Sequence, residues 1–401
     1  MRILLAYSGG LDTSWLVARL AREPGTEVTA LTVDCGGFTP EQRRSMAERA
    51  LALGAAGHCF VDGRARLFQR VLRWLIAGNV RRGGVYPLSV GAERTIMAEI
   101  LAEAALREGF DAVAHGSTGA GNDQVRFEAA WSAVAPGLQV LAPVRDLAPS
   151  RTQQRADLEQ ARLPLPEAGG RYSVNAGLWG LTIGGGEMGD SAAPLPEEAW
   201  QWTRPGDASA RFTLAFERGV PVGLDGERLD PVALIERLNR AAGRCGAGRG
   251  YHLGDTVLGI KGRVAFEAPA AELILSAHRE LEKLVLTEEQ RFWKDQLADA
   301  YGRKVHQGLL HEPLLRDIEA LFASSQQRVS GVARVHAAAG RVLVEGVESP
   351  HSLLAASDAR YGERPEPGRH PGGAAELARI LAEPARLYAR AGGTTPAALA
   401  P

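Results

Sequence analysis

Residues 6–14 read Ala-Tyr-Ser-Gly-Gly-Leu-Asp-Thr-Ser, a run of small, hydroxyl-bearing and acidic residues suited to binding phosphate groups. The adjacent Gly9 and Gly10 allow a tight turn and let a ligand approach the backbone closely. A helix that begins near Leu11 would add unpaired N–H groups and the positive end of its dipole. Because a carboxylate beside phosphates requires a cation between them, we expect Asp12 to bind Mg2+.

The neighbouring pattern places this run at a strand-to-helix turn. An apolar segment precedes it, and an amphipathic segment with Leu16, Val17 and Leu20 follows it. Strand and helix patterns continue to alternate up to about Ala148, which predicts a parallel sheet covered on both faces. Ligands of such sheets bind at the carboxyl ends of the strands, where this run falls. An ordinary strand-helix connection with glycines for geometry is the alternative interpretation.

A second glycine-rich loop occurs at residues 115–128, where three glycines precede Asn122 and Asp123. It follows a predicted strand at 111–114, so we expect it at the same edge of the sheet. Glycines before a helix start are typical of anion-binding turns. Asn122 and Asp123 could instead serve only as caps of the following helix.

The composition limits the class of protein. The 401 residues are 45% hydrophobic, which suffices for a large core and roughly two or three domains. Lys plus Arg (46) nearly balance Asp plus Glu (47), so we expect no nucleic-acid partner. The three cysteines form no Cys-x-x-Cys pair, which favours a reducing compartment. Without a signal-peptide pattern or an apolar run of about 20 residues, a cytoplasmic protein with no membrane insertion is expected.

The composition changes beyond Pro149. Residues 149–170 are polar and contain prolines, which we interpret as a connector. Mixed strand and helix patterns then predict an α+β domain. We expect helices at 234–242 and 267–285, another helix after the capping-box pair Thr287 and Gln290, and a hairpin at 331–345. The expected domains are a nucleotide-binding domain at 1–165, a substrate domain at 166–360, and a linker with a C-terminal helix at 361–401.

The spacing Ser-Gly-Gly-x-Asp-x-Ser resembles the loop of the ATP pyrophosphatase superfamily, whose members cleave ATP between the α and β phosphates. Together with the second loop, further segments in matching order make nearly the whole chain resemble the argininosuccinate synthase family. These segments are Tyr86-Pro87-Leu88 and residues 216–222, 259–263 and 348–353. The resemblance implies an α/β fold with a parallel-sheet ATP pyrophosphatase-type domain, an α+β synthetase domain and a C-terminal helix that joins subunits of a homotetramer.

The resemblance also implies an AMP-forming ligase of arginine biosynthesis. Members of the family activate the ureido oxygen of citrulline as an adenylate, which the amine of aspartate then attacks. By resemblance, Ser8 and Asp12 are catalytic, and ATP with Mg2+ contacts Ala6, Tyr7, Ser8, Gly9, Gly10, Leu11, Asp12, Thr13, Ser14 and Gly116. Aspartate is expected to bind Thr118, Asn122 and Asp123. The acceptor is expected to bind Tyr86, Asn122, Arg126, Ser173 and Thr182.

Several positions differ from the family pattern, mostly around the acceptor. Gly254 stands where a citrulline-binding glutamate belongs, and Phe266 stands where a tyrosine belongs. Further differences are Ala120 for a lysine, Val90-Gly91 for a Thr-Ser pair and Gly177 for an asparagine. Three hypotheses follow: a ligase for citrulline or a citrulline-like ureido or carbonyl acceptor, a paralogue with a different acceptor in a specialised pathway, or a nucleotide-binding protein without ligase activity.

Overall fold

The computed structural model describes residues 1–167, 170–204, 206, 208–368 and 371–392. The chain divides into two compact units, Met1–His351 and Ser352–Pro401. The first unit contains all three sheets, and the second contains helix α13, Pro371–Ala391. Within the described ranges, no helix is both long and apolar enough to pass through a membrane.

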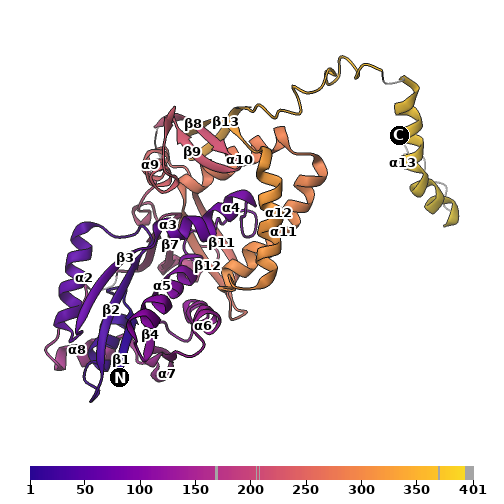
Figure 1. Ribbon diagram of the computed structural model, residues 1–401. Helices are drawn as coiled ribbons and strands as arrows, with labels where there is room; N and C mark the ends of the chain where they lie inside the picture. The colour runs from indigo at the N-terminus through magenta and orange to yellow at the C-terminus, as the bar shows by residue number, and fades with distance from the viewer. Residues whose placement is uncertain (168–169, 205, 207, 369–370, 393–401) are drawn as a thin grey trace. The chain divides into compact units, whose positions relative to one another are not determined.

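A five-stranded parallel sheet in the order β3-β2-β1-β4-β5 forms the N-terminal part of the first unit (Figure 1). Its strands are β1 (Arg2–Ala6), β2 (Glu27–Asp34), β3 (Gly57–Asp62), β4 (Ala112–His115) and β5 (Gln139–Leu141). Side chains of β1 alternate between two faces, because Ile3 and Leu5 pack in one core cluster and Leu4 packs in another. The predicted parallel sheet buried on both faces is confirmed.

Helices cover both faces of this sheet (Figure 1). One face carries α1 (Leu11–Leu20), α2 (Pro40–Ala52), α7 (Pro143–Leu147) and α8 (Arg151–Gln160). The other face carries α5 (Glu93–Glu108), α6 (Asp123–Val134) and a segment made of α3 (Arg64–Leu67), a π-helical turn (Phe68–Leu72) and α4 (Arg73–Ala77). The loops that follow β1 and β4 therefore emerge between two layers of helices.

Helix α8 corrects the interpretation of residues 149–170 as a connector. Ser150 caps this helix by accepting a hydrogen bond from the backbone N–H of Gln153 at 3.1 Å. Only Gln154 and Leu158 of the helix are buried, which explains why its sequence reads as polar. The helix packs on α1, where Trp15 Nε1 donates to Asp157 at 2.8 Å.

Two antiparallel sheets follow. The first has the order β11-β12-β7-β6 and consists of β6 (Tyr172–Gly177), β7 (Gly180–Gly185), β11 (Arg249–Asp255) and β12 (Lys261–Glu267). The second has the order β10-β9-β8-β13-β14 and consists of β8 (Ser209–Glu217), β9 (Val220–Leu224), β10 (Glu227–Arg228), β13 (Gly331–Ala338) and β14 (Arg341–Glu348). The expected hairpin at 331–345 is thereby confirmed as β13 and β14.

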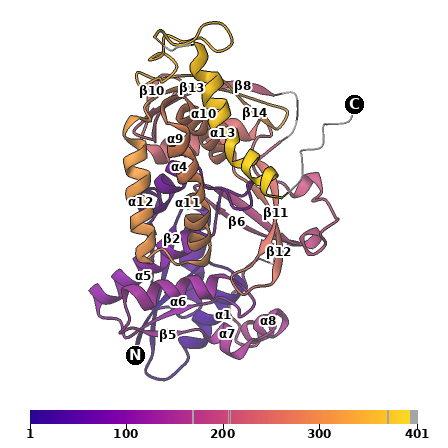
Figure 2. The same cartoon turned by 90° about the vertical axis from the view of Figure 1, so that its right-hand side faces the viewer.

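Four helices accompany these sheets: α9 (Pro231–Gly243), α10 (Pro269–Val285), α11 (Glu288–Gln307) and α12 (Pro313–Ser325). Figure 2 shows α11 and α12 side by side, in agreement with their packing contacts. The capping box predicted at Thr287 and Gln290 is present at the start of α11. The C-terminal end of α11 carries His306, which reaches the site described next.

Candidate active site

The loop between β1 and α1 has the backbone of an anion-binding turn. Gly9 has a φ of 72°, and a Cβ at this position would lie 2.9 Å from Met46, so both conformation and space require glycine. Gly10 is the N-cap of α1 and provides no side-chain cap. The first N–H groups of α1 are therefore available to an anion.

Asp12 is half-buried in the first turn of α1. One of its oxygens accepts a hydrogen bond from Gln154 Nε2 of α8 at 2.8 Å, and the other has no partner in the described part of the chain. A free carboxylate oxygen beside an anion-binding turn suits a Mg2+ ion shared with phosphates. Across the described ranges, no three His, Cys, Asp or Glu side chains gather as metal ligands, so phosphates and water would supply the remaining ligands.

Gln154 was not among the residues expected at the site. The interpretation of residues 149–170 as a connector assigns no helix to Gln154 and therefore gives it no role at the site. The pattern Ser150-x-x-Gln153 has the spacing of a capping box and was a usable signal for the helix. From that start, the helical period would have placed Gln154 and Leu158 on one face.

The two glycine-rich loops lie next to each other. Ala6 at the end of β1 pairs with His115 at the end of β4. A Cβ at Gly116 would lie 2.9 Å from Cγ2 of Thr13, so the second loop passes directly against the first turn of α1. Ser8 is exposed beside it, with Oγ 3.2 Å from the hydroxyl of Thr13. The structure thus brings the expected ATP-binding residues together.

The second loop ends at α6, where Asn122 and Asp123 make long-range contacts. Asn122 occupies the N-cap position, but its side chain does not cap the helix and instead accepts the N–H of Val257 at 2.8 Å. Asp123 accepts from Arg94 Nε at 2.9 Å and from Arg126 Nη1 at 2.8 Å. Burial opposes ionisation of Asp123, but these two arginines outweigh it and hold the pKa of the carboxyl well below its usual range. The alternative that Asn122 and Asp123 serve only as caps of α6 is therefore wrong, because both side chains bond to other elements.

A cavity of about 260 Å³ lies where α6 approaches the β11–β12 hairpin. Among the residues expected to bind the acceptor, Tyr86, Asn122, Arg126 and Thr182 line it. The expected Ser173 lies on β6 opposite Gly184, two residues before the lining residue Asn175 and outside the cavity lining. Thr118 is exposed on the loop and also lies outside the cavity lining. Lining residues that the sequence did not indicate include Arg82, Arg94, His252, Asp255, Arg263 and His306.

Arg126 is buried and fixed by α11. Its Nε donates to the backbone carbonyl of His306 at 2.9 Å, and its Nη2 lies 3.2 Å from His306 Nδ1. Burial, reinforced by Arg126 and Arg82, lowers the pKa of His306 to about 3. The imidazole is therefore neutral near pH 7 and helps to hold a guanidinium that forms one wall of the cavity.

Glu93 explains why residue 177 is glycine. A Cβ at Gly177 would lie 1.6 Å from Oε1 of Glu93, at the start of α5. Glu93 is 1% exposed, and its Oε1 has no hydrogen-bonding partner in the described chain. Burial raises the pKa of this carboxyl well above its usual range. Glu93 therefore occupies the space that an asparagine at 177 would need.

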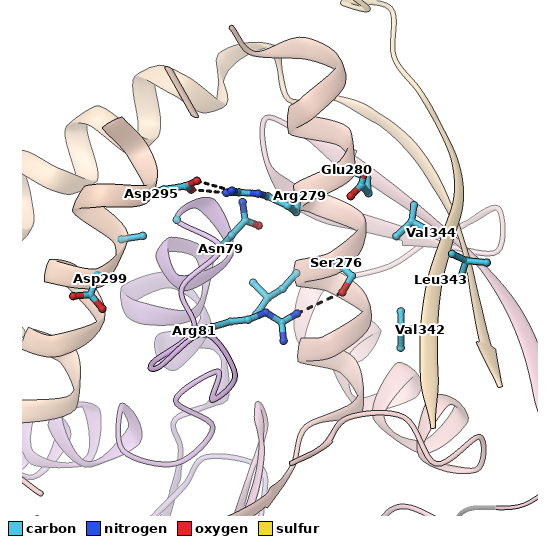
Figure 3. Close-up of a pocket in the computed structure, with 14 residues that line it drawn as sticks. Asn79, Arg81, Ser276, Arg279, Glu280, Asp295, Asp299, Val342, Leu343 and Val344 are labelled. Carbon is cyan, nitrogen blue, oxygen red and sulfur yellow. Dashed lines mark hydrogen bonds and ion pairs between the residues drawn. The ribbon is translucent and has the colours of Figure 1, made fainter. Parts of the chain in front are cut away.

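A larger cavity of about 720 Å³ lies among α10, α11 and β14 (Figure 3). Arg279 faces Asp295 across it and is bonded to that carboxylate, while Arg81 contacts Ser276 at 3.4 Å (Figure 3). None of the residues expected to bind ATP, aspartate or the acceptor lines this cavity. The smaller cavity, which the end of the second glycine-rich loop lines, is therefore the candidate site.

The parallel sheet, with a glycine-rich turn between β1 and α1, has the architecture of a HUP-type domain. Residues 2–164 match the "Arginosuccinate synthase N-terminal HUP domain", and residues 172–370 match the "Arginosuccinate synthase C-terminal domain". The chain belongs to the argininosuccinate synthase family. The predicted family and fold class are confirmed.

Relatives named argininosuccinate synthase cover most of the chain. The protein of Methanocaldococcus jannaschii is 36% identical over 90% of this chain and 92% of its own length. That of Natronomonas pharaonis is 40% identical over 90% of this chain and 89% of its own length. That of Pyrobaculum aerophilum is 38% identical over 87% of this chain and 89% of its own length. These relatives favour an argininosuccinate synthase-type ligase over a nucleotide-binding protein without ligase activity and over a paralogue that uses a different acceptor in a specialised pathway.

Proposed function

We propose that this chain condenses aspartate with citrulline or a citrulline-like ureido acceptor at the expense of ATP, through an adenylate, with release of AMP and pyrophosphate. The continuity of the second glycine-rich loop carries the proposal. This loop begins at Gly116, against the phosphate-binding turn, and ends at Asn122, in the wall of the smaller cavity. A nucleotide at one end of the loop and an acceptor at the other would meet along it.

We assign the nucleotide to Ala6–Ser14 and Gly116. The N–H groups at the start of α1 and the hydroxyls of Ser8 and Thr13 would hold the phosphates. Asp12 would hold Mg2+ through its free oxygen, and the bound ion would neutralise phosphate charge. Positioning and charge stabilisation are the main sources of rate enhancement in such transfers.

We assign aspartate to Thr118, Asn122 and Asp123, and the acceptor to the cavity lined by Tyr86, Asn122, Arg126 and Thr182. Arg126 and Arg94 offer guanidinium groups that can bind a carboxylate. Ser173 stays in this assignment as a residue on the approach along β6. The amine of aspartate would attack the adenylate as the neutral nucleophile, so the chain needs no further nucleophile.

The test is pyrophosphate and AMP formation by the purified protein with MgATP, aspartate and a ureido acceptor. Asp12→Asn should lower kcat/KM by about 100-fold, as expected when one charged group that stabilises the transition state is removed. Glu23→Gln, which alters an exposed carboxylate just beyond α1, is the matched control and should leave kcat/KM unchanged. Wild-type rates in Asp12→Asn, or no acceptor-dependent pyrophosphate in the wild type, would contradict the proposal.

We also propose a cytoplasmic homotetramer with domains at 1–165, 166–360 and 361–401. Exposed Leu377, Ile380 and Leu381 give α13 an apolar face that supports a role in assembly. Light scattering should give the mass of four chains for the full protein and a smaller mass for a chain that ends at residue 360. An unchanged mass would assign assembly to another surface.

A further inference from the structure

The carboxylates in the wall of the smaller cavity are both engaged by cations. Asp123 accepts hydrogen bonds from Arg94 and Arg126, and Asp255 lies 2.6 Å from Lys261. Among the described residues that line the cavity, these two are the only carboxylates. An ammonium group that enters the cavity would therefore meet no free carboxylate.

The same wall carries an excess of positive charge. Its arginines are Arg82, Arg94, Arg126 and Arg263. Arg82 donates to the backbone carbonyl of Asp255, and Arg263 donates to two further backbone carbonyls. These contacts orient the guanidinium groups without neutralising them. Four guanidiniums against two carboxylates favour an anionic ligand over a cationic one.

The imidazole of His252 fills the space that a side chain at position 254 would need. The two residues point to the same face of β11, and a Cβ at Gly254 would lie 2.6 Å from Nε2 of His252. The ring is held by stacking on Tyr86, with centroids 5.4 Å apart and 20° between the planes. The ring of His252 can thus occupy this position only because residue 254 has no side chain.

The Nε2 atom of His252 is buried and has no hydrogen-bonding partner in the described part of the chain. Burial, reinforced by Arg82, lowers the pKa of His252, so the ring is neutral near pH 7. A neutral imidazole can donate one hydrogen bond to a carboxylate or carbonyl oxygen. An unpartnered nitrogen in a cavity wall points to a ligand that completes its hydrogen bonding.

We propose that His252, with Gly254, selects a ureido acceptor that presents a carboxylate or an uncharged polar group to this wall in place of an ammonium. The inference deepens the function proposed above and rests on it. The acceptor remains a ureido compound, and the ureido end is still the group that is activated. Its chemical class is the ureido carboxylic acids that lack a free amino group.

The wild-type enzyme tests this directly. Pyrophosphate release with MgATP and aspartate is measured with citrulline, with N-acetyl-citrulline and with deamino-citrulline, which has hydrogen in place of the amino group. We expect kcat/KM for deamino-citrulline to exceed that for citrulline by about tenfold or more. Preference for citrulline would overturn the inference and leave the proposed function intact. Absence of release with every acceptor would overturn the proposed function and the inference with it.

A pair of variants separates specificity from general damage. The double variant His252→Ala/Gly254→Glu places a carboxylate in the wall and removes the ring that would collide with it. We expect the ratio of kcat/KM values to shift towards citrulline by about tenfold. His336→Ala, on β13 in another sheet, is the matched control and should leave the ratio unchanged. An unchanged ratio in a double variant that keeps a cooperative thermal transition would overturn the inference, and the wild-type comparison decides if that variant does not fold.

Discussion

The contact between Glu93 and residue 177 allows a double-mutant cycle that tests the structure around the active site. In the wild type, the carboxyl of Glu93 fills the space beside Gly177, and a Cβ at 177 would lie 1.6 Å from its Oε1. Gly177→Asn introduces a clash at a buried position, whereas Glu93→Ala removes the group that causes it. The double variant should therefore tolerate asparagine where the single variant does not.

The expected free energies follow from the geometry. Gly177→Asn should lower the free energy of unfolding by about 2 kcal/mol, a typical cost of overpacking a buried site. Glu93→Ala should lower it by about 1 kcal/mol, because Oε1 is buried without a partner but Oε2 lies 3.7 Å from Nη1 of Arg94. If asparagine fits the vacated space, the double variant should lie within about 1 kcal/mol of the wild type. The coupling energy between the two positions is then about 2 kcal/mol.

Urea unfolding of the four proteins measures this coupling, and KM for aspartate provides a second measurement. Arg94 follows Glu93 and is bonded to Asp123, so displacement of Glu93 in Gly177→Asn should raise this KM. Gly189→Asn is the matched control, since a Cβ at 189 has nothing within 4 Å. Additive effects within about 0.5 kcal/mol would refute the claim that the two side chains compete for one space.

Two further predictions concern other buried contacts. Gln154→Leu removes the hydrogen bond to Asp12 and should lower kcat/KM for MgATP by about tenfold, the value of one bond to a charged group, in steady-state assays. Burial opposes ionisation of Glu99, but His311 and Arg70 outweigh it and lower its pKa from 4.5 to about 2. Its stabilisation is present above pH 4.5 and is lost as the pH falls through about 2. Glu99→Gln should thus lower the free energy of unfolding by about 3 kcal/mol at pH 7 and weaken its decrease at acidic pH, as measured by urea unfolding at a series of pH values. An unchanged decrease at acidic pH would contradict the role assigned to Glu99.

The nucleotide end of the site could be predicted from sequence because it is built locally. Ser8, Gly9, Gly10 and Asp12 lie within five consecutive positions between a strand and a helix, and each signal acts over a few residues. The same local logic predicted the parallel sheet and the capping box at Thr287. The prediction was wrong at residues 149–170, because the polar composition was interpreted as a connector although Ser150 and Gln153 have the spacing of a helix cap.

At the acceptor end, the family resemblance predicted four of the lining residues, Tyr86, Asn122, Arg126 and Thr182, but the others could not be predicted because they meet only through long-range packing. Asn122 contacts Val257, 135 positions later, and Arg126 contacts His306, 180 positions later. No local pattern in the sequence indicates either contact. The collision between Glu93 and a side chain at 177 is likewise a property of packing, whereas the sequence showed only Gly177 as an isolated departure from the family pattern.

The register of β11 explains the departure from the family pattern at position 254. In the pairing of β11 with β12, Gly254 faces Gly262 and His252 faces Val264, so only His252 has a polar side chain among these four residues. Because side chains alternate along a strand, His252 and Gly254 share one face, and the loss of a side chain at 254 makes room for the ring at 252. A glycine that looked like a missing substrate contact is therefore part of an exchange in which a neutral hydrogen-bonding group replaces an anionic one. Such an exchange alters the acceptor end of the site and leaves the turn between β1 and α1 unchanged, so the proposed ligase reaction would be retained with the different acceptor preference proposed above.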